Sequence, residues 1–248
     1  MAAGKLWTRP ELMLAVELYC RTPFGRIHQG NPDIIKLANV LRRTPGSVGL
    51  KMVNFAALDE TIEQKGMSNV SKADREIWSE FFAAPAAFLD RVEGIRQTEY
   101  GLLDSLARFA LHEVREGVDV ERTIKVRRNQ SFFRDMILAA YNGKCAVTGI
   151  AQSELLVASH IVGWAQDSEL RLRPTNGICL NALHDRAFDR YLVSFEDTGE
   201  MILSKRLKVT GENKPFFEGK RLSLPQRFRP DLTYLGRHRD RLVELDRA

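Results

Sequence analysis

Cysteine is scarce in this 248-residue sequence, which contains only Cys20, Cys145 and Cys179. The three are widely spaced and form no Cys-x-x-Cys pair, which argues against a disulfide framework and against a four-cysteine zinc site. The sequence also has no apolar run near the roughly 18 residues of a membrane span, and its first residues lack the apolar core of a signal peptide. We therefore expect a cytoplasmic protein without a membrane segment.

No internal repeat or low-complexity tract occurs, and 44% of the residues are hydrophobic. The chain is thus long and apolar enough for one large domain or two smaller ones. Its net charge of +5 is unevenly distributed: Lys and Arg outnumber Asp and Glu in residues 1–58 (eight to three) and 121–248 (twenty-two to sixteen), but not in 59–120 (seven to thirteen). Two basic regions flanking an acidic one are typical of contact with a polyanion, although ordinary solvated surfaces remain the alternative.

The stretch from Leu155 to Arg190 gathers the most informative polar residues. Its apolar run LLVASHIV predicts a strand, a polar loop follows, GICL predicts a second strand, and NALHDRAFDR predicts a helix with Asn181 as its N-cap. We expect a strand, loop, strand, helix unit at this point.

Four motifs in this order and spacing resemble the HNH endonucleases, and within them a branch of restriction and phage-defence enzymes. They are CAVTG at 145–149, ASHIV around His160, RPTNGICL around Asn176 and LHDRAFDR at 183–190. Each motif alone carries little information, but together they extend over about 45 residues. The resemblance implies a ββα-metal fold for this part of the chain.

The resemblance also implies roles for individual residues. Cleavage of a phosphodiester needs a base that activates water and a cation that takes up negative charge. By resemblance His160 is the base, and Asn176 holds the base or its loop. Asp185 and Asp189 are four residues apart and share a helical face, where hard oxygen ligands suit Mg²⁺ or Mn²⁺. His184, directly before Asp185, remains a second candidate for the metal.

The sequence departs from the family pattern in three places, one of which is His184, because other members have a histidine at a later position of the helix. Many members have an Asp or His ligand directly before the base, whereas this chain has Ser159. Relatives often carry a zinc knuckle, of which Cys145 remains while Thr148 stands at the place of a second cysteine. A histidine on a strand is also often a purely structural residue, and Asp189 has an alternative as an exposed partner of Arg186 or Arg190.

Residues 1–58 predict three helices, the first capped by Thr8. The second and third are joined by a short connection and resemble the helix-turn-helix of DNA-binding domains. We expect the third to be the recognition helix. The predicted DNA contacts of this region are Arg42, Arg43, Ser47, Lys51 and Asn54. The alternative is a small helical bundle that serves packing or dimerisation.

Residues 59–124 predict an acidic helical spacer whose aromatic residues belong to a core, with an amphipathic stretch at 102–110. A helix ending at Asn142-Gly143 follows, and its Arg127, Arg128 and Arg134 are expected to brace the ββα unit or to contact phosphate. Beyond the motifs, the sequence predicts a hairpin, a loop with basic residues and a closing helix on which His238 is exposed.

The prediction is an α+β protein with a helical, helix-turn-helix-like domain (1–58), a helical spacer (59–124) and a ββα-metal nuclease domain (125–248). We expect a metal-dependent endonuclease acting on double-stranded DNA, in restriction or anti-phage defence with other proteins of such a system. The alternative is a non-catalytic DNA-binding protein with a degenerate nuclease centre.

Overall fold

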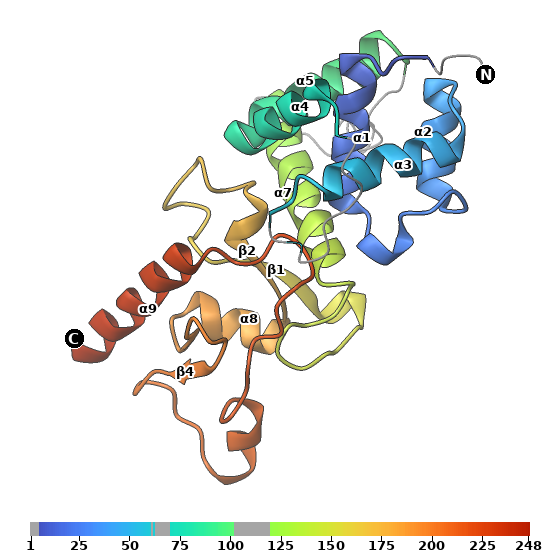
Figure 1. Cartoon of the computed structure of the whole chain (residues 1–248). Helices are drawn as coiled ribbons and strands as arrows, with labels where there is room; N and C mark the ends of the chain where they lie inside the picture. The colour runs from blue at the N-terminus through green and yellow to red at the C-terminus, as the bar shows by residue number, and fades with distance from the viewer. Residues whose placement is uncertain (1–4, 61, 63–69, 102–119) are drawn as a thin grey trace. The chain divides into compact units, whose positions relative to one another are not determined.

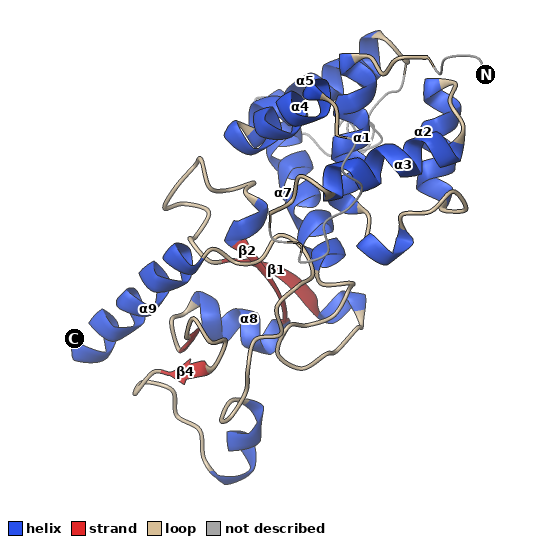
Figure 2. Cartoon of the chain, viewed as in Figure 1, coloured by secondary structure: helices blue, strands red, loops and turns tan. Residues whose placement is uncertain are grey.

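The computed structural model of the protein describes residues 5–60, 62, 70–101 and 120–248. The chain divides into two compact units, Met1–Phe132 and Phe133–Ala248. Among the described residues, the first unit is helical and the second combines helices with two small antiparallel sheets (Figure 2). This agrees with the predicted α+β class. The amphipathic stretch at 102–110 lies outside the described residues, and the three-segment division stays a prediction.

Helix α1, Arg9–Arg21, is the central helix of the first unit (Figure 1). Thr8 caps it as predicted, and Glu11 completes a capping box by accepting a hydrogen bond of 2.8 Å from the Thr8 amide. Every residue from Glu11 to Cys20 is buried, as expected for a helix enclosed by others. The surrounding helices are α2 (Pro32–Leu41), α3 (Pro45–Ala56), α4 (Lys72–Ala83) and α5 (Pro85–Thr98).

The turn between α2 and α3 is as tight as the sequence predicted. Arg42 adopts the left-handed conformation with φ 52°, and the amide of Arg43 donates to the Ala38 carbonyl at 2.9 Å. Thr44 then caps α3, with Pro45 in its first turn. The helix, turn, helix order is present, while its use in DNA binding stays a prediction.

The predicted recognition face of α3 is not an open polar surface. Lys51 is only 9% exposed, and its Nζ donates to both carboxylate oxygens of Asp74 on α4 at 2.8 and 3.0 Å. Arg43 donates to both oxygens of Glu11 at 3.1 and 2.7 Å and lies over the ring of Trp7. These two cations therefore hold helices together, because buried carboxylates lie within reach of both.

The aromatic residues of the acidic region belong to the core of the first unit, as predicted. Trp78, Phe81 and Phe88 are buried, and the Phe81 ring meets those of Phe88 and Phe132 edge-on, with centroids 5.4 and 6.2 Å apart. Within the part of the chain that the structure describes, no helix combines the length and apolarity needed to cross a bilayer.

The second unit is built on a strand, strand, helix arrangement. Strands β1 (Leu156–His160) and β2 (Gly177–Asn181) pair antiparallel, with His160 opposite Gly177. Helix α8 (Ala182–Asp189) follows β2 directly, because Asn181 caps it by accepting from the His184 amide at 3.0 Å. Helix α8 packs against both strands.

Helix α7, Val120–Ala140, approaches the same sheet with its last turns. A Cβ atom at position 177 would clash with the side chains of Ile137 and Phe133, so only glycine allows this close approach. The helix ends where the sequence predicted, with Asn142 and Gly143 both at positive φ.

The rest of the unit consists of strands β3 (Val193–Phe195) and β4 (Met201–Leu203), the 3₁₀ helix η4 (Gly211–Phe216) and helix α9 (Leu232–Arg247). The expectation that His238 on α9 is exposed is wrong. Its Nε2 donates to the Phe188 carbonyl at 3.0 Å, its Nδ1 accepts from the Ser194 hydroxyl at 2.9 Å, and its ring stacks on Phe188. Satisfied hydrogen bonds on both nitrogens allow this histidine to be buried.

Candidate active site

His160 is the last residue of β1 and is held on three sides. Its ring stacks on Phe133 with centroids 3.9 Å apart, and the ring of Trp164 lies edge-on at 5.4 Å. Its Nε2 lies 2.9 Å from the carbonyl oxygen of Arg171. Since a carbonyl oxygen only accepts, Nε2 carries the proton and Nδ1 keeps a lone pair.

The electrostatics of His160 favour the same form. Burial lowers the pKa of the imidazole, and the hydrogen bond to the Arg171 carbonyl opposes this shift only in part. The ring is thus neutral near neutral pH. Among the described residues Nδ1 has no hydrogen-bond partner, so it is able to accept a proton from a bound molecule.

Asn176 organises the loop between the two strands. Its side chain is fully buried; Oδ1 accepts from the Val162 amide at 2.8 Å, and Nδ2 donates to the carbonyls of Val162 and Leu170, both at 3.1 Å. The same loop carries Arg171, whose carbonyl orients His160. Asn176 therefore acts on the histidine through the backbone of the loop rather than by direct contact.

Ser159 and Asp185 connect β1 to α8. The buried Ser159 hydroxyl donates to Asp185 Oδ1 at 2.5 Å. Burial raises the pKa of the Asp185 carboxyl, the negative charge of Asp189 raises it further, and the Ser159 hydrogen bond opposes both. Asp185 is consequently a half-buried carboxylate without a cationic side chain in hydrogen-bond contact among the described residues, an arrangement that favours a bound cation.

Both ring nitrogens of His184 lie close to oxygen atoms of the protein. Its Nε2 lies 2.9 Å from the Phe216 carbonyl and its Nδ1 lies 3.0 Å from Asn181 Oδ1. Burial lowers the pKa of His184, against the effect of the Phe216 hydrogen bond. A neutral imidazole donates one hydrogen bond, and the bond from Nε2 to the Phe216 carbonyl makes His184 an anchor between α8 and the loop that contains Phe216.

Asp189 lies one helical turn beyond Asp185, at the end of α8. Its side chain is 66% exposed and lies 3.7 Å from an Arg186 nitrogen and 4.0 Å from Arg190 Nε. Exposed pairs of this length contribute little to stability. In this structure Asp189 therefore contacts Arg186 and Arg190 at the surface, which is the alternative role given for it by the sequence.

Residues 145–196 match the family model described as HNH endonuclease. This segment is an HNH domain. The family inferred from the sequence is confirmed for it, and the match contains all five residues predicted for catalysis or metal binding. No curated protein matches the chain.

The HNH domain offers few protein ligands for a metal ion. Among the described residues no three His, Cys, Asp or Glu side chains converge to hold one. Mg²⁺, however, retains several water ligands and binds through one or two carboxylates together with substrate phosphate oxygens. The Asp185 carboxylate, with the Ser159 hydroxyl beside it, fits an ion of that kind, whereas His184 does not.

Cys145 and Cys179, the two cysteines of the HNH domain, belong to no cluster of three metal-binding side chains within the part of the chain that the structure describes. Cys145 Sγ accepts from the Asn181 amide at 3.2 Å, and the Thr148 hydroxyl accepts from Asn181 Nδ2 at 3.1 Å. Burial raises the pKa of the Cys179 thiol to about 12, so this thiol stays protonated. Cys145 and Thr148 instead position the residue that caps the α8 helix.

The arginines predicted near the HNH domain have different environments. Arg134 donates to the carbonyls of Leu156 and Ser153 at 2.7 and 3.1 Å and so braces the start of β1, one of its two predicted roles. Arg128 pairs with Asp90 in the first unit, and Arg127 is exposed.

Sequence reasoning missed Phe133 and Arg171 as parts of the site. Phe133 lies on the helix that ends before Asn142-Gly143, and its ring supports the imidazole of His160. Arg171 acts through its backbone carbonyl, and no side-chain motif marks a carbonyl group.

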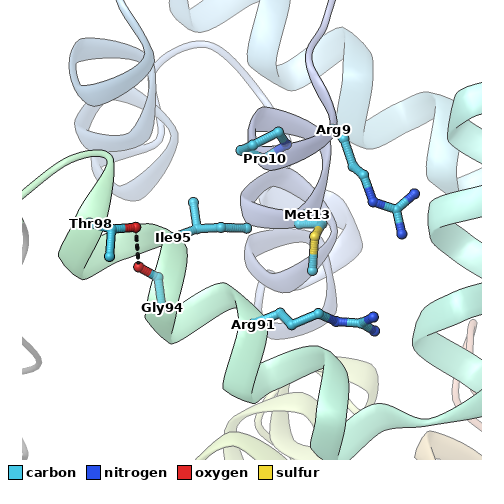
Figure 3. A pocket seen from close by; sticks show the side chains of 7 residues that line it. All are labelled: Arg9, Pro10, Met13, Arg91, Gly94, Ile95 and Thr98. Carbon is cyan, nitrogen blue, oxygen red and sulfur yellow. Dashed lines mark hydrogen bonds between the residues drawn. The ribbon is translucent and has the colours of Figure 1, made fainter.

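A separate pocket of about 420 Å³ lies in the first unit between α1 and α5 (Figure 3). Its wall includes Pro10, Met13 and Ile95, with Arg9 and Arg91 at one side. Both arginines are ion-paired with Glu80. The pocket is therefore mainly apolar, and its cations are already neutralised.

Proposed function

We propose that the protein is an endonuclease that hydrolyses phosphodiester bonds of double-stranded DNA with water activated by His160. The observation that carries this proposal is the hydrogen bond from His160 Nε2 to the Arg171 carbonyl, which leaves Nδ1 as the basic nitrogen. A general base needs a lone pair in a fixed position and a pKa near or below the working pH. The lowered pKa of His160 meets the second condition.

In the proposed reaction, His160 Nδ1 takes a proton from water as the water oxygen forms a bond to phosphorus. The bond from phosphorus to the 3′ oxygen breaks, and this oxygen takes up a proton from solvent water, which leaves a 5′-phosphate and a 3′-hydroxyl. A divalent cation, Mg²⁺ or Mn²⁺, would neutralise negative charge on the phosphate and on the leaving oxygen. Asp185, with Ser159, would hold that cation.

The other residues of the site act on position. Asn176 fixes the loop whose Arg171 carbonyl sets the tautomer of His160, and Phe133 fixes the plane of the ring. Ser159 and His160 are adjacent on a strand, so their side chains leave it on opposite faces. Because β1 ends at His160, we place the scissile phosphate at that end of the strand pair.

The biological setting we propose is restriction or anti-phage defence. It rests on the resemblance of the four motifs to that branch of the HNH family and on the basic regions of the sequence. Other proteins of a defence system are the partners that this setting implies.

A non-catalytic DNA-binding protein is the second candidate function. It is favoured by the hydrogen bond of 2.5 Å between Ser159 and Asp185, which occupies one oxygen of the half-buried Asp185 carboxylate. A degenerate centre of this kind would bind DNA without hydrolysing it.

Incubation of the full chain with supercoiled plasmid and Mg²⁺ or Mn²⁺ separates the two candidates. The nuclease should relax or linearise the plasmid, and His160→Ala should lower the rate by about 10² to 10⁴ with DNA affinity nearly unchanged. His28→Ala is the matched control, because His28 is exposed and belongs to the first unit. Cleavage by His160→Ala at the wild-type rate, or none by the wild type with either ion, would overturn the proposal.

A further inference from the structure

The segment after the HNH domain carries an exposed basic loop, Lys205–Arg221. From residue 201 to the end, twelve Lys and Arg face six Asp and Glu, whereas residues 133–200 have six and nine. The positive charge of the second unit is thus concentrated outside the matched segment. Within the loop, Lys208 and Lys220 have no ion-pair or hydrogen-bond partner for their side chains among the described residues.

The loop is held in place at both ends and at its tip. At the start of the loop the Lys205 amide donates to Asp246 Oδ2 at 2.9 Å, and at its end the Met201 amide donates to the Lys220 carbonyl at 2.9 Å. At the tip, the Phe216 carbonyl binds His184 Nε2 at 2.9 Å, and the buried Phe217 ring packs on the His184 ring. The loop is therefore anchored to α8 at the residue next to Asp185.

This anchorage presents Phe216 to solvent. Its side chain is 53% exposed although Phe217, the next residue, is buried. The short helix η4 and Pro215 restrict the backbone at this point. A single exposed apolar residue is unremarkable by itself, but this one occupies a fixed position between cations and is joined to the helix that carries Asp185.

We propose that Lys205–Arg221 is a DNA-contacting element of the endonuclease, in which Phe216 packs against bases and Lys208 and Lys220 contact the flanking phosphates. The inference deepens the proposed function and rests on it for the cleavage readout. Aromatic side chains stack on bases or enter a base step, and lysines bind phosphates as point charges. His184 would then position the loop relative to Asp185 instead of binding metal.

The test compares Phe216→Ala with Leu224→Ala, a residue of the same unit with the same 53% exposure. We expect Phe216→Ala to weaken binding of a short DNA duplex, measured by fluorescence anisotropy without metal, by about tenfold, within the range for loss of one stacked aromatic. A duplex with 2-aminopurine should change its fluorescence on binding the wild type, and this change should be lost in Phe216→Ala. Leu224→Ala should behave as wild type in both measurements.

The lysines are tested through the salt dependence of binding. Lys208→Ala with Lys220→Ala should lower the slope of log affinity against log salt by up to about two units, roughly one per phosphate contact. Lys144→Ala, exposed in the same unit but outside the loop, should leave the slope unchanged. Wild-type affinity and slope in all loop variants would overturn the proposal.

The outcomes also separate this inference from the proposed function. Cleavage by the wild type, with wild-type binding by the loop variants, removes the loop as a contact and leaves the nuclease standing. A wild type that binds DNA through Phe216 but does not cleave it supports the loop and overturns the nuclease. A chain that neither binds nor cleaves DNA overturns both.

Discussion

The two units of the molecule use their basic residues in different ways. In the first unit Lys51, Arg43 and Arg96 are bound by the buried carboxylates of Asp74, Glu11 and Glu17. In the second unit the excess cations follow the HNH domain, and some of them face solvent. Residues 1–58, which contain Lys51 and Arg43, and residues 201–248 are both basic in sequence. Local net charge therefore indicates a nucleic-acid surface only when the charges are free of internal partners.

Two carboxylates show the same contrast. Asp74 is fully buried and accepts from Lys51 through both oxygens and from the Ser71 amide. Asp185 is half-buried and accepts from the Ser159 hydroxyl, and its pKa is raised by burial and by Asp189. The first carboxylate has its charge neutralised inside the fold, whereas the second retains a charge that a ligand would neutralise.

The largest expected effect is on the stability of the first unit. Lys51→Ala should lower its free energy of unfolding by about 3 to 5 kcal/mol, because Asp74 would be left as an unpaired buried charge. Urea unfolding followed by tryptophan fluorescence measures it, and the exposed Lys36→Ala is the control, with a change within about 0.5 kcal/mol. Replacing both partners, Lys51→Met with Asp74→Leu, should recover most of the loss.

A different result would contradict the structural role of Lys51. If Lys51→Ala is as stable as the wild type but binds DNA more weakly, Lys51 is a DNA contact and α3 is the recognition helix predicted from the sequence.

The second expected effect is a pH dependence of the stability of the second unit, which His238 causes. Burial lowers the pKa of His238 from 6.5 to about 4, with the hydrogen bond to the Phe188 carbonyl opposing it. Between these values the unfolded chain binds a proton that the folded chain does not, so stability is full above pH 6.5 and falls as the pH drops toward 4. The linkage amounts to about 3 kcal/mol at most.

Thermal unfolding of the wild type and of His238→Gln from pH 7.5 to 4 measures this contribution. The groups in contact with the ring are the Phe188 carbonyl, the Ser194 hydroxyl and the Tyr191 ring. His160 and His184 also have lowered pKa values and remain in both proteins. The difference between the two profiles isolates His238, and parallel profiles would contradict its assignment.

Local signals in the sequence predicted the elements of the fold well. Thr8, Asn181 and the Asn142-Gly143 pair mark helix ends in the structure as they do in the sequence, because caps depend on neighbouring residues. The spacing of the four motifs likewise predicted the strand pair and α8. These features require no knowledge of distant contacts.

Long-range partners were beyond the reach of the sequence. The polar spacing of Lys51 on α3 predicts an exposed face, and only packing of α4 reveals that Asp74 covers it. In the sequence, the adjacent residues His184 and Asp185 are equally plausible metal ligands. In the structure they differ, because His184 is hydrogen-bonded to the Phe216 carbonyl, 32 residues away in the sequence. Burial of His238 depends in the same way on Phe188 and Ser194.

The smallest expected effect concerns Asp189, and it compares the exposed carboxylate of α8 with the half-buried carboxylate of Asp185 on the same helix. Asp189→Asn should raise the metal concentration for half-maximal cleavage by less than about threefold, because the charge of an exposed group is screened by water and salt. Since Asp189 contributes to the raised pKa of Asp185, Asp189→Asn should also lower that pKa and extend metal-dependent cleavage to lower pH.

Asp185→Asn removes the half-buried charge beside Ser159 and should raise the metal concentration for half-maximal cleavage much further than Asp189→Asn. Titration of Mn²⁺ against the plasmid cleavage rate of both variants gives the comparison. An equal rise of that concentration in the two variants would mean instead that both carboxylates hold the same ion, as the four-residue spacing in the sequence predicts.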